Sequence, residues 1–165
     1  MFSFFKKKEE AVEALPIHVS DTDIVAVADG TMIPLEQVKD EVFAQKMMGD
    51  GVAFELKGDV IYAPCNGTLA AAFPTGHAFG FAMKDGVELL IHIGINTVNG
   101  NGDGFQVLAK QGQEVSAGIP LVKLDLKKLR ANYDMTTMLI ITAAGDKEIC
   151  FIDYGDVTRG QKINK

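Results

Sequence analysis

The sequence predicts an all-β fold, a sandwich or barrel of short strands with one or two short helices. Apolar runs of strand length alternate with glycine or Asn-Gly turns, and successive runs begin roughly ten residues apart. Within the run at 87–95 the large aliphatic side chains occupy every second position, as in a strand with one buried face. The chain contains 17 glycines, which suits a fold with many turns.

The individual elements follow from runs of β-branched, aromatic and aliphatic residues that end at Gly, Asn or Asp. Two further segments have helical character, at 39–47 and at 125–133, and Asp125 is the expected N-cap of the second. Strands are expected, in chain order, at residues 51–56, 59–67, 68–73, 77–83, 87–95, 104–110, 138–144 and 148–155.

A short internal sequence repeat, called the internal echo below, supports a β-barrel whose chain folds back on itself. The segments EVSAGIPL and DVTRGQKI, at 114–121 and 156–163, both follow the pattern acidic-Val-x-x-Gly-x-x-aliphatic. Gly118 and Gly160 are expected in left-handed turns, with the valine and the aliphatic residue of each segment in the core. The segment NGNGDG lacks the spacing and the final glutamate of a calcium loop, and it is interpreted as a glycine turn.

Length and charge limit the possible functions. The 165 residues suit one domain, which we place at 21–165 after a flexible tail at 1–20. The formal net charge of −6 argues against nucleic acid as the main partner. No apolar run approaches the roughly 20 residues of a membrane-spanning helix.

The first ten residues, MFSFFKKKEE, have too few apolar residues before their lysines for a signal peptide, so a cytoplasmic location is expected. Phe2, Phe4 and Phe5 with the following lysines also permit a weak amphipathic contact with an anionic membrane. Cys65 and Cys150 are expected to be reduced structural thiols, because neither belongs to a C-x-x-C pair.

His92 is out of phase with the apolar residues of its strand and is therefore expected to face away from the core. A short turn around Lys84-Asp85-Gly86 joins this strand to the one that begins with His77. Two-residue loops would place the two imidazoles on one face, whereas a three-residue loop with a bulged Gly86 would place them on opposite faces. In the first case, the shared face would also carry Phe79, Phe81 and Leu90, an apolar patch typical of a contact site.

Two imidazoles can bind zinc, act as acid and base, or carry a covalent group. A catalytic zinc site normally needs a third protein ligand, so His77 and His92 would bind zinc only with a ligand from a partner. No suitably placed Ser or Cys completes a hydrolytic triad. A phosphoryl carrier needs only a neutral imidazole nucleophile, a hydrogen-bonding neighbour and an apolar rim, and no cofactor.

Four segments in order, DGTMIPLEQVKDEVFAQKMMGDGVAF, APCNGTLAAAFPTGHAFGFAM, GVELLIHIGINTV and GQEVSAGIPLVKLDL, closely resemble the glucose-family enzyme IIA of the bacterial phosphoenolpyruvate sugar phosphotransferase system. The resemblance runs from about Asp21 to the end. It implies an antiparallel β-sandwich with barrel-like features, and transfer of a phosphoryl group from the carrier protein HPr to the cysteine of a sugar-permease IIB domain. Regulatory partner proteins can use the same face.

The resemblance also implies residue roles. His92 matches the phosphorylated histidine, His77 its partner, and Thr75 the threonine that orients the partner ring. Asp40 matches an acidic residue that meets HPr, which presents a basic surface. Phe43 and Phe73 match apolar residues around the site. Asn96 stands where the family has an aspartate, so one charge of the docking surface is missing.

Judged from the residues without the resemblance, three other classes of protein remain as alternatives. A lipoyl- or biotinyl-type carrier would need a lysine in an M-K-M-type hairpin, and AMKDGV is the nearest approach. A zinc peptidase of related fold would need an H-x-H pair. The sequence does not distinguish a phosphoryl carrier from a regulatory binding protein that passes no phosphate on to a sugar. The resemblance implies that the choice of sugar lies in the membrane domains of the permease.

Overall fold

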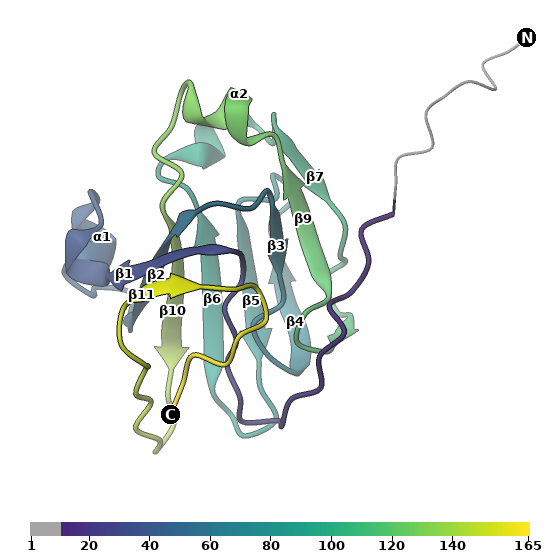
Figure 1. Ribbon diagram of the computed structural model, residues 1–165, viewed down its shortest axis with the longest axis vertical. Coiled ribbons are helices and arrows are strands. Elements are labelled where there is room, and N and C mark those ends of the chain that lie inside the picture. Colours follow the sequence, from purple (N-terminus) through teal and green to yellow (C-terminus); the bar gives the residue numbers. More distant parts are fainter. Residues whose placement is uncertain (1–10) are drawn as a thin grey trace, which may run out of the picture.

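The computed structural model describes residues 11–165 and confirms the expected class, with antiparallel strands and two short α-helices (Figure 1). A large sheet has the strand order β11-β1-β2-β10-β6-β5-β4-β8, and a small sheet has the order β3-β9-β7. The strands are β1 Gly30–Pro34, β2 Asp50–Leu56, β3 Val60–Tyr62, β4 Gly67–Ala72, β5 Ala78–Ala82, β6 Glu88–Ile93, β7 Phe105–Val107, β8 Glu114–Val115, β9 Pro120–Leu124, β10 Thr137–Ala143 and β11 Gly155–Val157. The helices are α1 Glu41–Ala44 and α2 Leu126–Arg130, with 3-10 turns η2 Leu35–Gln37 and η3 Thr97–Gly100.

One hydrophobic core lies between the two sheets. Ile61 from β3 and Leu121 from β9 join Phe54, Phe79 and Leu89 from the large sheet in one buried cluster. Alternation along the strands produces this arrangement, because every second side chain of each strand enters the same layer.

A second, smaller cluster covers part of the outer face of the large sheet. Leu35 of η2 and Phe43 of α1 pack there against Ala53 of β2 and Met138 of β10. Asp40 begins α1 as its N-cap, since its carboxylate accepts a hydrogen bond from the Val42 amide at 2.9 Å. In Figure 1, α1 projects at the left beside β1 and β2.

The internal echo has the expected structure. Gly118 and Gly160 have positive φ angles of 91° and 80°, and Val115, Val157, Leu121 and Ile163 are buried. The Leu15 amide donates to the Gly118 carbonyl at 3.0 Å, and the side chains of Leu15 and Ile17 lie against both glycines. Residues 1–10 of the predicted tail, including the phenylalanines and lysines proposed to touch a membrane, lie outside the described residues.

Two expectations about smaller elements have different outcomes. Asp125 caps α2 as expected, because its side chain accepts from the Lys128 amide. The strand expected at 148–155 is wrong: this segment forms only an isolated bridge between Phe151 and Asn164, and β11 begins at Gly155. Backbone hydrogen bonds from Ile152 to Ile163 and from Lys165 to Cys150 flank this bridge, but the pairing does not extend into a ladder within the described residues.

The two cysteines are free thiols in the structure. Burial, and next the charge of Asp85, raise the pKa of Cys65 to about 12, so this thiol stays protonated at neutral pH. Cys150 is exposed. Among the described residues, no helix is both long and apolar enough to cross a membrane.

Candidate functional site: a pair of histidines at the end of two strands

His92 lies on the outer face of β6, as its phase in the sequence predicted. Its neighbours Ile91 and Ile93 are buried in the core, whereas His92 is half-buried. The strands on either side place Ala78 of β5 and Met138 of β10 directly opposite it. The ring of Phe43 in α1 contacts the imidazole, with centroids 4.9 Å apart.

The backbone after β6 fixes the orientation of the His92 ring. Its Nδ1 lies 2.9 Å from the Gly94 carbonyl oxygen. Because a carbonyl oxygen can only accept, Nδ1 carries the proton and Nε2 keeps its lone pair. Gly94 has a φ of +75°, and a Cβ at this position would lie 2.5 Å from Cγ2 of Thr97 and 2.9 Å from Sδ of Met135. Glycine is therefore required by both conformation and space.

His77 contacts His92, although strict alternation along the two strands would place their side chains on opposite faces. The hairpin has the three-residue loop Lys84-Asp85-Gly86, closed by a hydrogen bond from the Met83 amide to the Val87 carbonyl. Alternation through this register would separate the two rings, yet their centroids lie 5.3 Å apart in an edge-to-face arrangement. His77 stands one residue before β5, directly after a turn at Gly76 (φ +76°), so its side chain is not bound by the alternation of the strand.

Thr75 and Phe73 hold the His77 ring from the same turn. The Thr75 hydroxyl is hydrogen-bonded to Nδ1 of His77, and Phe73 contacts the ring edge-on at a centroid distance of 5.3 Å. His77 is only 6% exposed, whereas Phe73 is 45% exposed. The turn therefore places a buried imidazole against His92 and an exposed aromatic ring against that imidazole.

Two of the residues expected in the apolar patch around the histidines lie elsewhere. Phe79 and Phe81 do not lie on the face of the histidines, because the observed register directs both into the core, where they are at most 2% exposed. Leu90 is half-buried on the His92 face. Exposed apolar side chains on neighbouring segments instead come from Val42 beside Phe43 and Val98 in η3.

Asp40 and Asn96 lie on segments that flank the histidines. Asp40 is half-buried at the start of α1, and its charge acts on His92. Asn96 is exposed in a left-handed conformation (φ +62°) directly after the bend at Gly94 and Ile95. The contribution of the Gly94 carbonyl was not predicted; a glycine two positions after a strand histidine is the signal that could have found it.

Both imidazoles are held in the neutral form. Burial lowers the pKa of His92 below the ordinary 6.5, and the Gly94 hydrogen bond and the Asp40 charge partly offset this. Burial, and then the charge of His92, lower the pKa of His77. At neutral pH the site therefore presents an unprotonated Nε2 on His92. Within residues 11–165 no three His, Cys, Asp or Glu side chains are grouped to hold a metal ion.

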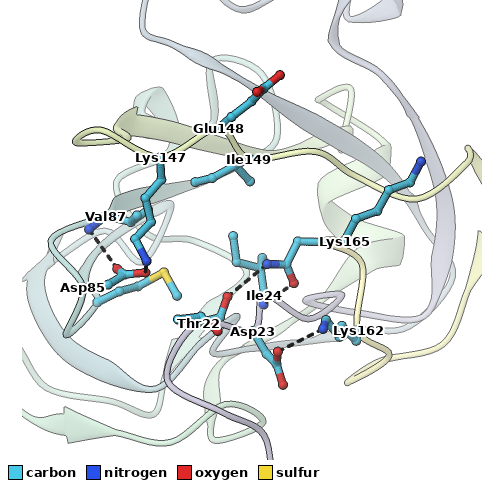
Figure 2. A pocket seen from close by; sticks show the side chains of 12 residues that line it. Thr22, Asp23, Ile24, Asp85, Val87, Lys147, Glu148, Ile149, Lys162 and Lys165 are labelled. Atoms are coloured by element: carbon cyan, nitrogen blue, oxygen red, sulfur yellow. Dashed lines mark hydrogen bonds and ion pairs between the residues drawn. The ribbon is translucent and has the colours of Figure 1, made fainter.

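A separate hollow lies at the other end of the β5–β6 hairpin, five residues from His92 along β6 and thus roughly 17 Å away. This cavity of about 260 Å³ is lined by segments around Asp23, Asp85, Lys147 and Lys162. Figure 2 shows its two ion pairs, Lys147–Asp85 at 3.1 Å and Lys162–Asp23 at 3.2 Å. Its charges largely satisfy one another, so the histidine pair is the better candidate for chemistry.

Comparison with known proteins identifies relatives over most of the chain. A family model described as phosphoenolpyruvate-dependent sugar phosphotransferase system, EIIA 1, matches residues 22–147. The PTS system glucose-specific EIIA component of Mycoplasma capricolum subsp. capricolum is 43% identical over 141 residues, which are 85% of this chain and 92% of the relative. The solved structure of glucose permease IIA from Mycoplasma capricolum has a TM-score of 0.82 at 42% identity, and covers 86% of this chain and 93% of its own.

The substitution Asp40→Asn tests the electrostatics of the site. Asparagine retains the oxygen that caps α1 but removes the charge that raises the pKa of His92. The pKa of His92, followed by NMR titration of its ring protons, is expected to fall further below 6.5. Glu148→Gln, at the remote hollow, is the control and should leave it unchanged. An unaltered or raised pKa in Asp40→Asn would contradict this account.

Proposed function

Because the chain belongs to the EIIA 1 family of the phosphoenolpyruvate-dependent sugar phosphotransferase system, we propose that it carries a phosphoryl group on His92. The group arrives from the phosphocarrier HPr and leaves to the IIB domain of a sugar permease, which couples sugar uptake to phosphorylation. The observation that carries the proposal is the contact between two imidazoles, one of which has its Nδ1 bonded to a backbone carbonyl and its Nε2 free. Family membership leaves the lipoyl-type carrier and the zinc peptidase without support.

Nε2 of His92 is the proposed nucleophile. Its lone pair attacks the phosphorus of the phosphohistidine on HPr; a new N–P bond forms on His92 while the N–P bond on the carrier breaks and its electron pair stays with the carrier imidazole. The lowered pKa keeps the attacking nitrogen unprotonated at neutral pH. In the second transfer a cysteine thiolate of IIB attacks the same phosphorus, and His92 is the leaving group.

His77 is the proposed stabiliser of the phosphoryl oxygens. When the Thr75 hydroxyl donates to Nδ1 of His77, the ring proton lies on Nε2 and is available to a phosphoryl oxygen. A donor held in place before the reaction is most effective where negative charge builds up in the transition state. Thr75 is thus a positioning residue that acts through His77.

The apolar rim is the proposed docking surface for HPr and IIB. Phe43 and Phe73 each contact one imidazole, and Phe73 is substantially exposed. A phosphoryl group adds close to two negative charges, by analogy with phosphoserine, at the centre of this rim. Partners that bury the rim are therefore expected to discriminate between the two states, which permits regulation by phosphorylation. The two relatives from Mycoplasma capricolum are a glucose-specific EIIA component and a glucose permease IIA.

His92→Gln tests the acceptor. Incubation of the wild-type chain with phosphoenolpyruvate, enzyme I and HPr should produce acid-labile, base-stable phosphate, and the variant should take up none. Glutamine is polar and close in size, so the variant is expected to fold, which circular dichroism checks. Label that persists in His92→Gln and disappears in His77→Gln would overturn the assignment.

His77→Gln should still accept phosphate but transfer it about 10²–10⁴-fold more slowly, in the range of general catalytic contributions. Thr75→Val, which lacks the hydroxyl, should also slow transfer, whereas Thr75→Ser retains the hydroxyl and should stay near the wild-type rate. Rapid-quench measurement of single-turnover rates distinguishes the three variants. Equal rates for Thr75→Val and Thr75→Ser would remove the hydroxyl from the mechanism.

A further inference from the structure

A carboxylate that the sequence did not single out, Asp134, lies in the segment that leads into β10, the strand that pairs with β6 beside His92. In the pairing of β10 with β6, Met138 stands directly opposite His92, so the two side chains share a face. Two and four residues before Met138 come Thr136 and Asp134. Burial continues the alternation here, since Met135 and Thr137 are buried, Thr136 is half-buried and Asp134 is exposed.

The backbone of Asp134 adjoins the bend that orients His92. The Ile95 amide donates to the Asp134 carbonyl at 2.9 Å, and a Cβ on Gly94 would lie 3.3 Å from the same oxygen. Asp134 is therefore next to the bend after β6 that leads to Asn96, an exposed and uncharged residue.

The Asp134 side chain is held in place by hydrogen bonds from Thr136. Its Oδ1 accepts from the Thr136 amide at 2.9 Å and from the Thr136 hydroxyl at 2.7 Å. None of the ion pairs in residues 11–165 includes Asp134. Desolvation raises the pKa of Asp134, but the hydrogen bonds from Thr136 and the charge of Lys39 outweigh this effect. The net shift of the pKa is downward, so the carboxyl group is ionised at neutral pH.

We propose that Asp134 is an acidic docking residue of the histidine face and supplies the negative charge that Asn96 does not. It would meet a guanidinium or ammonium group of the phosphocarrier. The net charge of −6 favours a basic partner. Asp40 acts on His92 itself and Asp134 adjoins the bend that follows His92, so a carrier docked on this face would meet two carboxylates. This inference rests on the proposed function, because it assumes that a carrier protein docks at this face.

Asp134→Asn tests the inference, with Glu148→Gln as the matched control. Asparagine retains the oxygen that accepts from Thr136, so the thermal unfolding temperature should not change. Glu148 is an exposed carboxylate at the remote hollow. In stopped-flow binding to purified HPr, Asp134→Asn should associate about two- to five-fold more slowly than wild type at low salt and converge with it at high salt. Glu148→Gln should follow the wild-type curve throughout.

A rescue variant separates charge from shape. Adding Asn96→Asp to Asp134→Asn returns one negative charge to the rim and should restore most of the low-salt rate. An association rate of Asp134→Asn equal to that of Glu148→Gln at every salt concentration overturns the inference.

Phosphate transfer tests the proposed function, and HPr binding tests the role of Asp134, so the two proposals can fail independently. If the wild-type chain binds HPr but takes no phosphate onto His92, the proposed function fails, and the salt dependence of binding still decides the role of Asp134. If the wild-type chain does not bind HPr, both proposals fail.

Discussion

The hydrogen bond between Nδ1 of His92 and the carbonyl of Gly94 is the interaction on which the site depends. It exists because the chain leaves β6 through a left-handed glycine that has no room for a side chain. The bend turns the Gly94 carbonyl back toward the imidazole and assigns the ring proton to Nδ1. The same bend continues into η3, where the Thr97 hydroxyl donates to the Ile93 carbonyl. A backbone constraint, rather than another side chain, thus selects the nitrogen that we propose as the nucleophile.

The large sheet provides the surroundings that keep the His92 imidazole neutral. Strand order places β6 between β5 and β10, so His92 has short or flexible side chains, Ala78 and Met138, on its two flanks. The rings of Phe43 and His77 both contact the imidazole. The enclosure lowers the pKa of the imidazole by desolvation without removing it from solvent altogether. The result is a neutral imidazole near the surface, which suits the proposed transfer between proteins better than a closed pocket would.

Local patterns predicted the class of fold and the direction of His92, because alternation is a property of the strand itself. Several registers of the β5–β6 hairpin fit the sequence equally well, and the loop adopted is the one for which alternation separates the histidines. Their contact depends on the turn at Gly76, which frees His77 from the strand before β5 begins. Phe79 and Phe81 were misplaced for the same reason, since a shift of one residue exchanges the two faces. Asp134 could not be found from sequence, because it reaches the site only through the pairing of β10 with β6, more than forty residues apart.

The tautomer of His92 is the most direct test of this account. In protein labelled with ¹⁵N in its histidines, the chemical shifts and two-bond couplings of the ring nitrogens report which nitrogen carries the proton. The structure predicts a neutral His92 with its proton on Nδ1 near pH 7.5, and after phosphorylation a phosphoryl group on Nε2. A neutral ring protonated on Nε2, or a phosphoryl group on Nδ1, would contradict the central claim that the Gly94 carbonyl selects the nucleophile.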